Sequence, residues 1–318
     1  MAVQPRWDSP QDMFGFYNYL EKEYKATELS RVLVRMDPYN YPEKQFPMLQ
    51  SEWAQDRLLL VLMDEMNLAR TEYYFSEFLS RLELRRAVKD PASSAMRSEA
   101  EIELDAGPGK HRFRIWVQQN VFFVGTMNED ETTQTLSDKV LDRANVLRFG
   151  KPDENAKVVR NGNGRVAVTN LKYLSCTRWE TWKRDVKENA DWYDSISKWT
   201  VRLNAALNRV GRPFGFRVLQ AIAHYVANYP RVEDGERHKL AFADQVEQKI
   251  IPKIRGIDLS TDNANECLNE IESIISELGD TELSNAFSTA RSESRMVGTF
   301  QWRGVTRRAE EDQPRHAH

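Results

Sequence analysis

An acidic pair follows a run of apolar residues in the first quarter of the chain. Residues 58–63 are Leu-Leu-Leu-Val-Leu-Met, and Asp64 and Glu65 come directly after them. Such a continuous apolar run predicts a strand that is buried on both faces of a parallel sheet. Open α/β sheets bind their ligands at the carboxyl ends of their strands, which is where this pair would lie. The alternative is that the two carboxylates only cap the next helix.

A second apolar run also ends in polar residues. Residues 121–124 are Val-Phe-Phe-Val, and Gly-Thr-Met-Asn128 follows them. If the two predicted strands are neighbours in a parallel sheet, Asn128 lies beside Glu65, because the carboxyl ends of parallel strands meet at the same edge. An amide at that place could orient a water molecule against a phosphate.

An arginine follows shortly after the second strand. Arg143 lies near the end of a predicted short helix at residues 136–144, just before a predicted strand at 145–149. There it would project from the flank of the domain. The alternative is a surface ion pair with Asp142 or Asp138.

The composition restricts the class of protein. A chain of 318 residues, 41% hydrophobic and 29% charged, fits a globular protein of two domains. Its net charge of −3 gives no overall basic field for nucleic acid. Cys176 and Cys267 lie far apart without Cys or His at metal-ligand spacing, which argues against zinc and disulfides and indicates a reducing compartment. With no signal pattern or membrane-spanning apolar run, we expect a cytoplasmic protein without a membrane partner.

The apolar pattern predicts an α/β part followed by a helical part. In the α/β part we expect a helix from about Gln11 through Tyr24, a helix from Thr71 to about Arg86, and a β-hairpin formed by residues 100–104 and 112–117. In the helical part we expect helices at 179–189, 193–210, 215–229 and 240–250, and a last one around 267–278. The polar residues 150–164 mark the boundary. The expected domains are therefore 1–150 and 151–306, with a disordered tail at 307–318.

Four runs of sequence together resemble the McrB-like branch of the AAA+ NTPases. They are Leu-Met-Asp64-Glu65-Met-Asn-Leu-Ala-Arg70, Gly125-Thr-Met-Asn128, Lys139-Val-Leu-Asp142-Arg143-Ala-Asn145 and Arg212-Pro-Phe-Gly-Phe-Arg217. This branch resembles the MoxR and dynein-related clade, which inserts a hairpin before the sensor-1 strand, and the hairpin expected within 100–117 fits that. The resemblance extends over nearly the whole chain. It implies the α/β core of a P-loop NTPase, built on a parallel sheet, followed by an all-α lid domain.

The resemblance also implies a role for five residues. Asp64 would hold the Mg²⁺ of bound ATP or GTP, and Glu65 would activate the attacking water. Asn128 would be the sensor-1 residue beside that water. Arg143 would be an arginine finger that acts in a neighbouring subunit. Arg217, which opens a predicted helix, would be the sensor-2 residue that reaches the γ-phosphate; its alternative is an ordinary ion pair on the helix surface.

McrB-like proteins are the motor subunits of restriction systems that cut modified DNA. The resemblance therefore implies a role in restriction and phage defence. It implies a ring, expected to be a hexamer, of identical copies or of P-loop-containing subunits. A McrC-like nuclease would be the partner, and DNA would be contacted indirectly through the complex. McrB has an Asp three residues after its sensor Asn, whereas here Asp130 is two residues after and Glu131 three, so ATP and GTP both stay open.

The sequence lacks the motif Gly-x-x-x-x-Gly-Lys-Ser/Thr, whose backbone N–H groups and lysine cradle nucleotide phosphates. The run Gly-Pro-Gly-Lys-His at 107–111 has no Ser or Thr after its lysine, and Gly-Asn-Gly-Arg at 162–165 has no lysine. We expect that the first strand, the P-loop and the first helix of the fold are missing from this sequence, through a miscalled start, a split gene or the choice of its limits. The chain alone should therefore bind nucleotide poorly.

Two other functions compete with a hydrolase. A non-hydrolysing interaction subunit would supply the arginine finger and the lid to a neighbouring P-loop chain. The presence of both Asp64 and Glu65 argues against it, because nothing structural requires the glutamate. A nucleic-acid-binding module is the third class: Trp179, Trp182 and Trp192 lie near Lys and Arg, but aromatic residues at helical spacing are more typical of a core.

Overall fold

The computed structural model describes residues 1–306 except 43, 50–51, 109–111, 129–135 and 151–173. Of the described residues, 1–140 and 174–182 form one compact unit, unit 1, and 141–150 and 183–306 form a second, unit 2. Most of the predicted boundary at 150–164 and the predicted tail at 307–318 lie outside the described residues.

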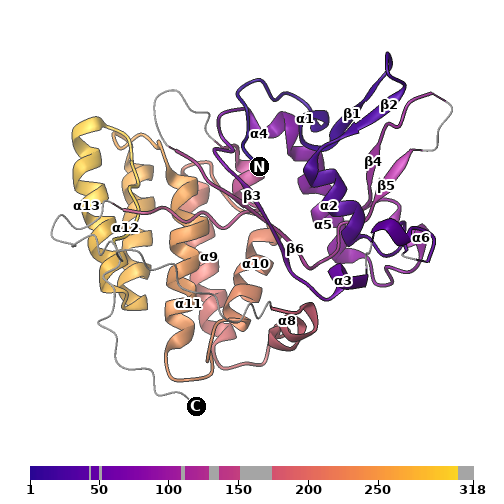
Figure 1. Cartoon of the computed structure of the whole chain (residues 1–318). Helices are drawn as coiled ribbons and strands as arrows, with labels where there is room; N and C mark the ends of the chain where they lie inside the picture. Colours follow the sequence, from indigo (N-terminus) through magenta and orange to yellow (C-terminus); the bar gives the residue numbers. More distant parts are fainter. Residues whose placement is uncertain (43, 50–51, 109–111, 129–135, 151–173, 307–318) are drawn as a thin grey trace, which may run out of the picture. The chain divides into compact units, whose positions relative to one another are not determined.

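A pair of parallel strands lies at the centre of unit 1 (Figure 1). The strands are β3 (Leu59–Met63) and β6 (Val121–Gly125), and their register places Met63 opposite Gly125. The two apolar runs were expected to be neighbours in a parallel sheet, and this prediction is confirmed.

The opening residues of the chain lie along the other edge of β3. A parallel bridge joins Ala2 to Asp64, and the Val3 N–H donates to the Asp64 carbonyl oxygen at 3.0 Å. The chain on the carboxyl side of β3 therefore has a backbone neighbour on each side.

One face of β3 is open to solvent, so the prediction that this strand is buried on both faces is wrong. Leu60 and Leu62 are 63% and 48% exposed, whereas Met63 is buried. In the described parts of the chain this sheet consists of β3 and β6. A continuous apolar run is consistent with burial on both faces but does not establish what covers the second one.

The other face of the strand pair packs against aromatic rings. The ring of Phe78 lies 4.7 Å from that of Phe123 on β6, and 5.4 Å from those of Phe14 and Phe75, measured between centroids. All three pairs have an edge-to-face arrangement, which adds to the energy of burial. This cluster ties the first helix and the helix after the acidic pair to the sheet.

The first helix is shorter than predicted, because α1 (Pro10–Phe14) ends well before Tyr24. Gly15 follows with φ of 107°, and a Cβ atom there would lie 2.1 Å from the carbonyl oxygen of Lys25. Both features require glycine. The prediction of a helix through Tyr24 is wrong because this residue turns the backbone out of the helix.

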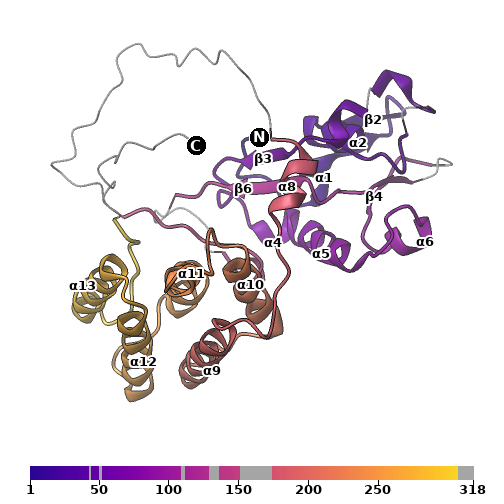
Figure 2. The same ribbon diagram turned by 90° about the horizontal axis from the view of Figure 1, so that it is seen from below.

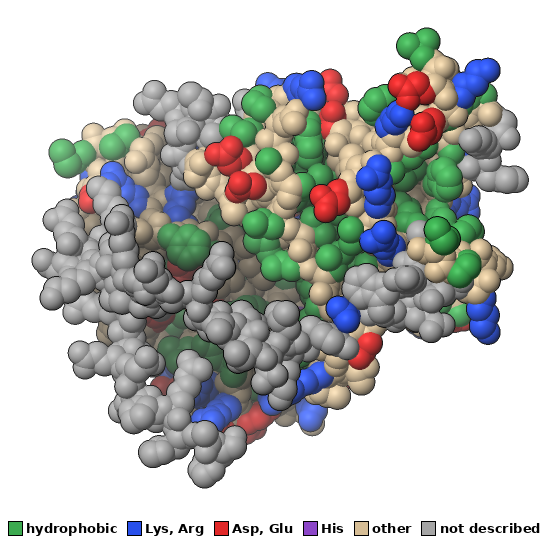
Figure 3. Space-filling view, in the orientation of Figure 1, with side chains coloured by type: hydrophobic (Ala, Val, Ile, Leu, Met, Phe, Trp, Pro, Cys, Tyr) green, Lys and Arg blue, Asp and Glu red, His purple; other side chains and the backbone are tan. Residues whose placement is uncertain are grey.

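The chain continues as an antiparallel hairpin of β1 (Gly15–Asn18) and β2 (Glu23–Ala26). The side-chain oxygen of Asn18 accepts the N–H of Leu20 at 2.9 Å and so closes the turn. Leu20 is almost fully exposed. Figure 3 shows hydrophobic side chains among charged ones over this hairpin.

The helices between this hairpin and unit 2 are mostly short. The helix expected from Thr71 to Arg86 is divided at Phe75, the residue that ends one helix and precedes the next. The elements are α2 (Glu28–Met36), η1 (Pro47–Leu49), α3 (Glu52–Gln55), α4 (Thr71–Tyr74), α5 (Ser76–Leu84), η2 (Arg85–Ala87), α6 (Ser94–Arg97), α7 (Asp138–Leu141) and α8 (Cys176–Trp182).

The expected hairpin before β6 is confirmed as β4 (Ile102–Leu104) paired antiparallel with β5 (Phe113–Ile115). A buried ion pair precedes it, with 2.9 Å between Arg97 Nε and Glu101 Oε1 and side chains only 4% and 3% exposed. Asn40 donates its amide N–H to Glu101 at 2.9 Å and accepts from Arg97 at 3.1 Å. The two buried charges are therefore both paired and hydrogen-bonded.

Unit 2 is built from five main helices, which Figure 2 shows from below. The helices expected at 193–210, 215–229 and around 267–278 are confirmed, whereas the helix at Thr281–Val297 was not expected. The helices are α9 (Tyr193–Arg209), α10 (Phe216–Ala227), α11 (Arg237–Gln245), α12 (Asp262–Leu278) and α13 (Thr281–Val297). Their apolar faces form one core, which includes Leu203, Phe242, Ile271 and Phe287.

The helix expected at 240–250 changes its geometry part of the way along. It is α-helical in α11, becomes a π-helical turn in η3 (Val246–Ile250), and tightens to a 3₁₀ turn in η4 (Ile251–Ile254). Pi-helical turns are rare and are often found at functional sites.

The strand expected at 145–149 does not form a ladder among the described residues. A single parallel bridge joins Phe149 to Val305 there. None of the helices in the described parts combines the length and the hydropathy that a membrane span requires.

Removal of the Arg97 charge should destabilise unit 1. In Arg97→Met the Glu101 carboxylate stays buried without its cation, and such a loss costs roughly 3–5 kcal/mol. We expect the free energy of unfolding of unit 1, measured in urea, to fall by that amount. Arg112→Met is the matched control, because Arg112 pairs with Glu103 on the surface and its loss should have little effect. Equal effects of the two substitutions would contradict the importance of the buried pair.

Candidate functional site

Three of the five predicted residues meet at the carboxyl ends of β3 and β6. Because the strands are parallel, the residues that follow Met63 and Gly125 leave the sheet at the same edge. Asp64 and Glu65 follow the first strand, and Asn128 lies three residues after the second. The Nδ2 of Asn128 donates to Glu65 Oε1 at 3.2 Å. The expected proximity of these two side chains is confirmed.

A residue that the sequence analysis did not single out links the two strand ends. The Thr126 hydroxyl donates to Asp64 Oδ1 at 2.6 Å and accepts the backbone N–H of Glu65 at 2.9 Å. Its own N–H donates to the carbonyl oxygen of Met63 at 2.9 Å. One hydroxyl therefore orients both acidic residues. The apolar pattern does not reveal this role, because it depends on the register that places the residue after β6 opposite the residue after β3.

The backbone of Glu65 is in the left-handed region, with φ of 54°. This conformation costs a residue with a side chain roughly 1–2 kcal/mol. Two hydrogen bonds hold it: the Glu65 N–H to the Thr126 hydroxyl, and the Met66 N–H to the Thr126 carbonyl oxygen at 2.9 Å. Backbone strain of this kind concentrates at functional sites.

Two buried side chains support the edge from behind. Asn67 donates its amide N–H to the Asn128 carbonyl oxygen at 2.8 Å, and the Tyr74 hydroxyl donates to the Met66 carbonyl oxygen at 2.6 Å. Asn67 and Tyr74 were not predicted to act here. They fix the backbone of the residues next to Glu65 and that of Asn128, while the carboxylates themselves stay exposed.

The donor set at this edge fits a magnesium ion. Mg²⁺ is usually held by one or two protein carboxylates and keeps water or phosphate oxygens as its other ligands. Asp64 and Glu65 are exposed, and Asp64 Oδ2 accepts no hydrogen bond from the residues that the structure describes. No group of three or more His, Cys, Asp or Glu side chains suited to a metal occurs among those residues. The site would therefore hold Mg²⁺ through Asp64 together with a ligand's phosphates.

The two predicted arginines belong to unit 2. Arg217 is the second residue of α10 and is exposed, as expected for a residue that opens this helix. Arg143 is half-buried, two residues after the end of α7. Asp142, which was weighed as a partner of Arg143, forms an ion pair with Lys253. The structure thus brings Asp64, Glu65 and Asn128 together, and the roles of both arginines stay predictions.

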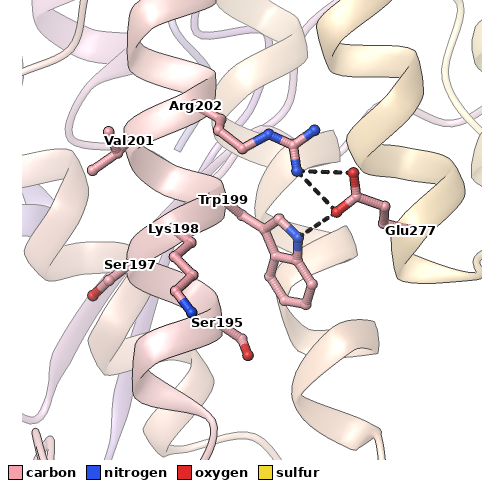
Figure 4. A pocket seen from close by; sticks show the side chains of 7 residues that line it. All are labelled: Ser195, Ser197, Lys198, Trp199, Val201, Arg202 and Glu277. Atoms are coloured by element: carbon pink, nitrogen blue, oxygen red, sulfur yellow. Dashed lines mark hydrogen bonds and ion pairs between the residues drawn. The ribbon is translucent and has the colours of Figure 1, made fainter.

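A separate hollow lies in unit 2 between α9 and α12, with a volume of about 600 Å³. Within it, Glu277 accepts hydrogen bonds from Trp199 Nε1 at 2.9 Å and from Arg202 at 2.8 Å (Figure 4). These polar groups satisfy one another, and the other lining residues are Ser195, Ser197, Lys198 and Val201. The hollow has no constellation that could perform chemistry, so the acidic edge is the better candidate.

Substitutions of Glu65 should reveal the left-handed strain in the free energy of unfolding. Glycine adopts this conformation freely and valine hardly at all. The free energy of unfolding of Glu65→Val should therefore be lower than that of the wild type by about 1 kcal/mol or more, while that of Glu65→Gly should equal or exceed it. The same substitutions at Glu77 in α5 are the control, because glycine there should lower stability by about 1 kcal/mol. If Glu65→Gly is as harmful as Glu77→Gly, the strain is not present.

Comparisons with known proteins bear on the second half of the chain. A family model described as a domain of unknown function (DUF8727) matches residues 171–297. Searches of curated proteins and of solved structures gave no match. The family match covers α8 to α13 and carries no activity with it.

Proposed function

We propose that this chain is a subunit of a McrB-like AAA+ NTPase, which hydrolyses ATP or GTP within a ring and drives a partner nuclease in restriction and phage defence. In this proposal the α/β part is the AAA+ core and the helical part is its lid. The ring is a hexamer of identical copies or includes P-loop-containing subunits, and it acts in the cytoplasm. A McrC-like nuclease would contact DNA for the complex.

One observation carries the proposal. Asp64, Glu65 and Asn128 lie at the shared edge of two parallel strands, joined through the Thr126 hydroxyl and the Asn128 side chain. A strand-end carboxylate for Mg²⁺, a second carboxylate for water and a nearby amide are the side chains that phosphoryl transfer to water requires. The left-handed Glu65 backbone fits the same interpretation, because strain of this kind clusters at functional sites, although Lys22 and Arg231 have the same φ of 54° in turns.

Each residue has a distinct task in the proposed reaction. Mg²⁺, when held by Asp64, would neutralise charge on the phosphates. Glu65 would accept a proton from the attacking water, and Asn128, which donates to Glu65 Oε1, would keep the carboxylate in place. Arg143 and Arg217 would bind the charge that develops on the γ-phosphate, the first of them in a neighbouring copy.

The phosphate cradle is the part that this sequence does not supply. It contains no Gly-x-x-x-x-Gly-Lys-Ser/Thr motif, so the cradle has to come from another segment or another chain. Asp130 and Glu131, on which the choice between ATP and GTP depends, lie outside the described residues. The proposal therefore leaves both nucleotides open.

A non-hydrolysing interaction subunit is the second candidate. It would use Arg143 and the lid to complete the site of a neighbouring P-loop chain, and Glu65 would have no task. The absence of a P-loop motif favours this alternative, whereas the hydrogen-bonded acidic edge favours the hydrolase.

The chain by itself should bind nucleotide poorly. Without a cradle for the β-phosphate, Asp64 and Mg²⁺ alone give little affinity. Calorimetric titration of the purified chain with ATP or GTP, in the presence of Mg²⁺, should therefore show no binding in the micromolar range. A micromolar dissociation constant for either nucleotide would contradict this expectation.

Hydrolysis should be measured on the complex that the chain forms in its own cells. The tagged chain is purified with its partners, and the release of phosphate from ATP and GTP is compared between variants. If the chain hydrolyses nucleotide, Glu65→Gln should lower kcat about 10²–10⁴-fold, and Arg143→Ala about 10³-fold or more. Glu77→Gln and Arg209→Ala, which alter surface ion pairs, are the matched controls.

The two candidate functions give different results in that experiment. Loss of activity in Arg143→Ala but not in Glu65→Gln would identify an interaction subunit that completes a neighbour's site. Unchanged activity in both variants, or a complex that hydrolyses neither nucleotide, would refute the proposal.

A further inference from the structure

Two buried lysines hold the segment that carries Arg143. Lys249 lies in η3 and Lys253 in η4, and their side chains are among the buried charged groups of unit 2. Lys249 Nζ donates to the carbonyl oxygen of Ala144 at 2.8 Å, and Lys253 forms an ion pair with Asp142. The residues immediately before and after Arg143 are therefore attached to two consecutive turns, η4 and η3.

The helix also provides a backbone acceptor for this segment. Pro252 has no N–H, so it cannot donate to the carbonyl oxygen of Gln248, four residues earlier. That oxygen accepts the N–H of Val146 at 3.1 Å. Residues 142–144 form a turn and a bend, and the segment is attached at three positions, through the Asp142 side chain, the Ala144 carbonyl oxygen and the Val146 N–H.

The attachment continues toward residue 150. A Cβ atom at Gly304 would lie 2.3 Å from the carbonyl oxygen of Arg148, so the two backbones are closely packed, and Phe149 forms its bridge with Val305. The whole described segment 141–150 thus belongs to unit 2, although α7 begins in unit 1.

Stability alone does not account for lysines at these positions. A buried ammonium group is expensive to desolvate, and an apolar residue of similar size is often as good or better for stability. The core of unit 2 contains a large apolar cluster, and Gln245, Glu247 and Gln248 are buried beside the two lysines. Both ammonium groups act on the backbone or side chain next to Arg143, which gives them a task that apolar side chains could not perform.

We propose that Lys249 and Lys253 are positioning residues for Arg143. They fix its segment to η3 and η4, so that unit 2 rather than the strands of unit 1 presents this arginine to the nucleotide of a neighbouring copy. The proposal rests on the proposed function for the task of Arg143, but the anchoring of the segment can be tested without nucleotide.

The first test measures hydrogen exchange of the Val146 amide in the full-length chain by NMR. Lys253→Met removes the ammonium group while it keeps an apolar stem, and should accelerate this exchange at least tenfold while amides in the middle of α9 and α12 are unchanged. Lys253→Arg should restore most of the protection. Lys239→Met is the control, because Lys239 pairs with Glu236 on the surface.

A second variant covers the case in which Lys253→Met does not fold. Asp142→Asn leaves the helix intact and weakens the same attachment from the segment's side, so it should accelerate the Val146 exchange in the same way. Unchanged exchange in a folded Lys253→Met or Asp142→Asn variant would overturn the anchoring, whatever the complex hydrolyses.

The second test measures hydrolysis by the complex purified with its partners. Lys253→Met should lower kcat at least tenfold and leave KM within about twofold, because substrate binding is not affected, and Lys253→Arg should recover the rate. If Arg143→Ala lowers kcat but Lys253→Met does not, the positioning role is overturned and the proposed function stands. If Arg143→Ala has no effect, the finger itself is refuted, and the positioning role falls with it.

Discussion

The parallel ladder between β3 and β6 determines which side chains meet at the acidic edge. Because Met63 lies opposite Gly125, the next residues on each strand, Asp64 and Thr126, come within hydrogen-bond distance. A slip of one residue would turn every side chain of one strand to the other face, and the hydroxyl would no longer reach both acidic residues. At Gly125 a Cβ atom would lie 2.0 Å from the sulfur of Met66, so a larger residue there would have to displace the Met66 side chain.

The strands and the acidic cluster could be predicted because they depend on patterns that are local in sequence. Two apolar runs, each followed by polar residues, were enough to place Glu65 beside Asn128. The hydrogen bonds of Thr126 and the left-handed backbone of Glu65 could not be predicted in the same way. They arise only when two segments about 60 residues apart are brought side by side, as the pairing of Asp64 with Thr126 illustrates.

The helices show the same distinction. The first helix ends at Gly15, whose φ of 107° and close approach to the Lys25 carbonyl oxygen are not revealed by any periodicity.

The last helix, α13, was missed because Ala290 and Ser294 are half of the buried positions on its inner face and give a weak apolar signal. Lys249 and Lys253 would have been placed on the surface by any hydrophobic pattern. Their burial follows from tertiary contacts with residues more than 100 positions earlier.

The division of the predicted residues between two units limits how a reaction could use them. Asp64, Glu65 and Asn128 belong to unit 1, and Arg143 and Arg217 to unit 2. A reaction that needs all five requires both units in one definite arrangement, or a contribution from a neighbouring copy. The proposed ring would meet this requirement, because Arg143 would serve the site of the next subunit while Arg217 would serve that of its own chain. Firm attachment of the Arg143 segment to unit 2 would then be necessary, because an arginine on a loose connection between the units would have no fixed position in that site.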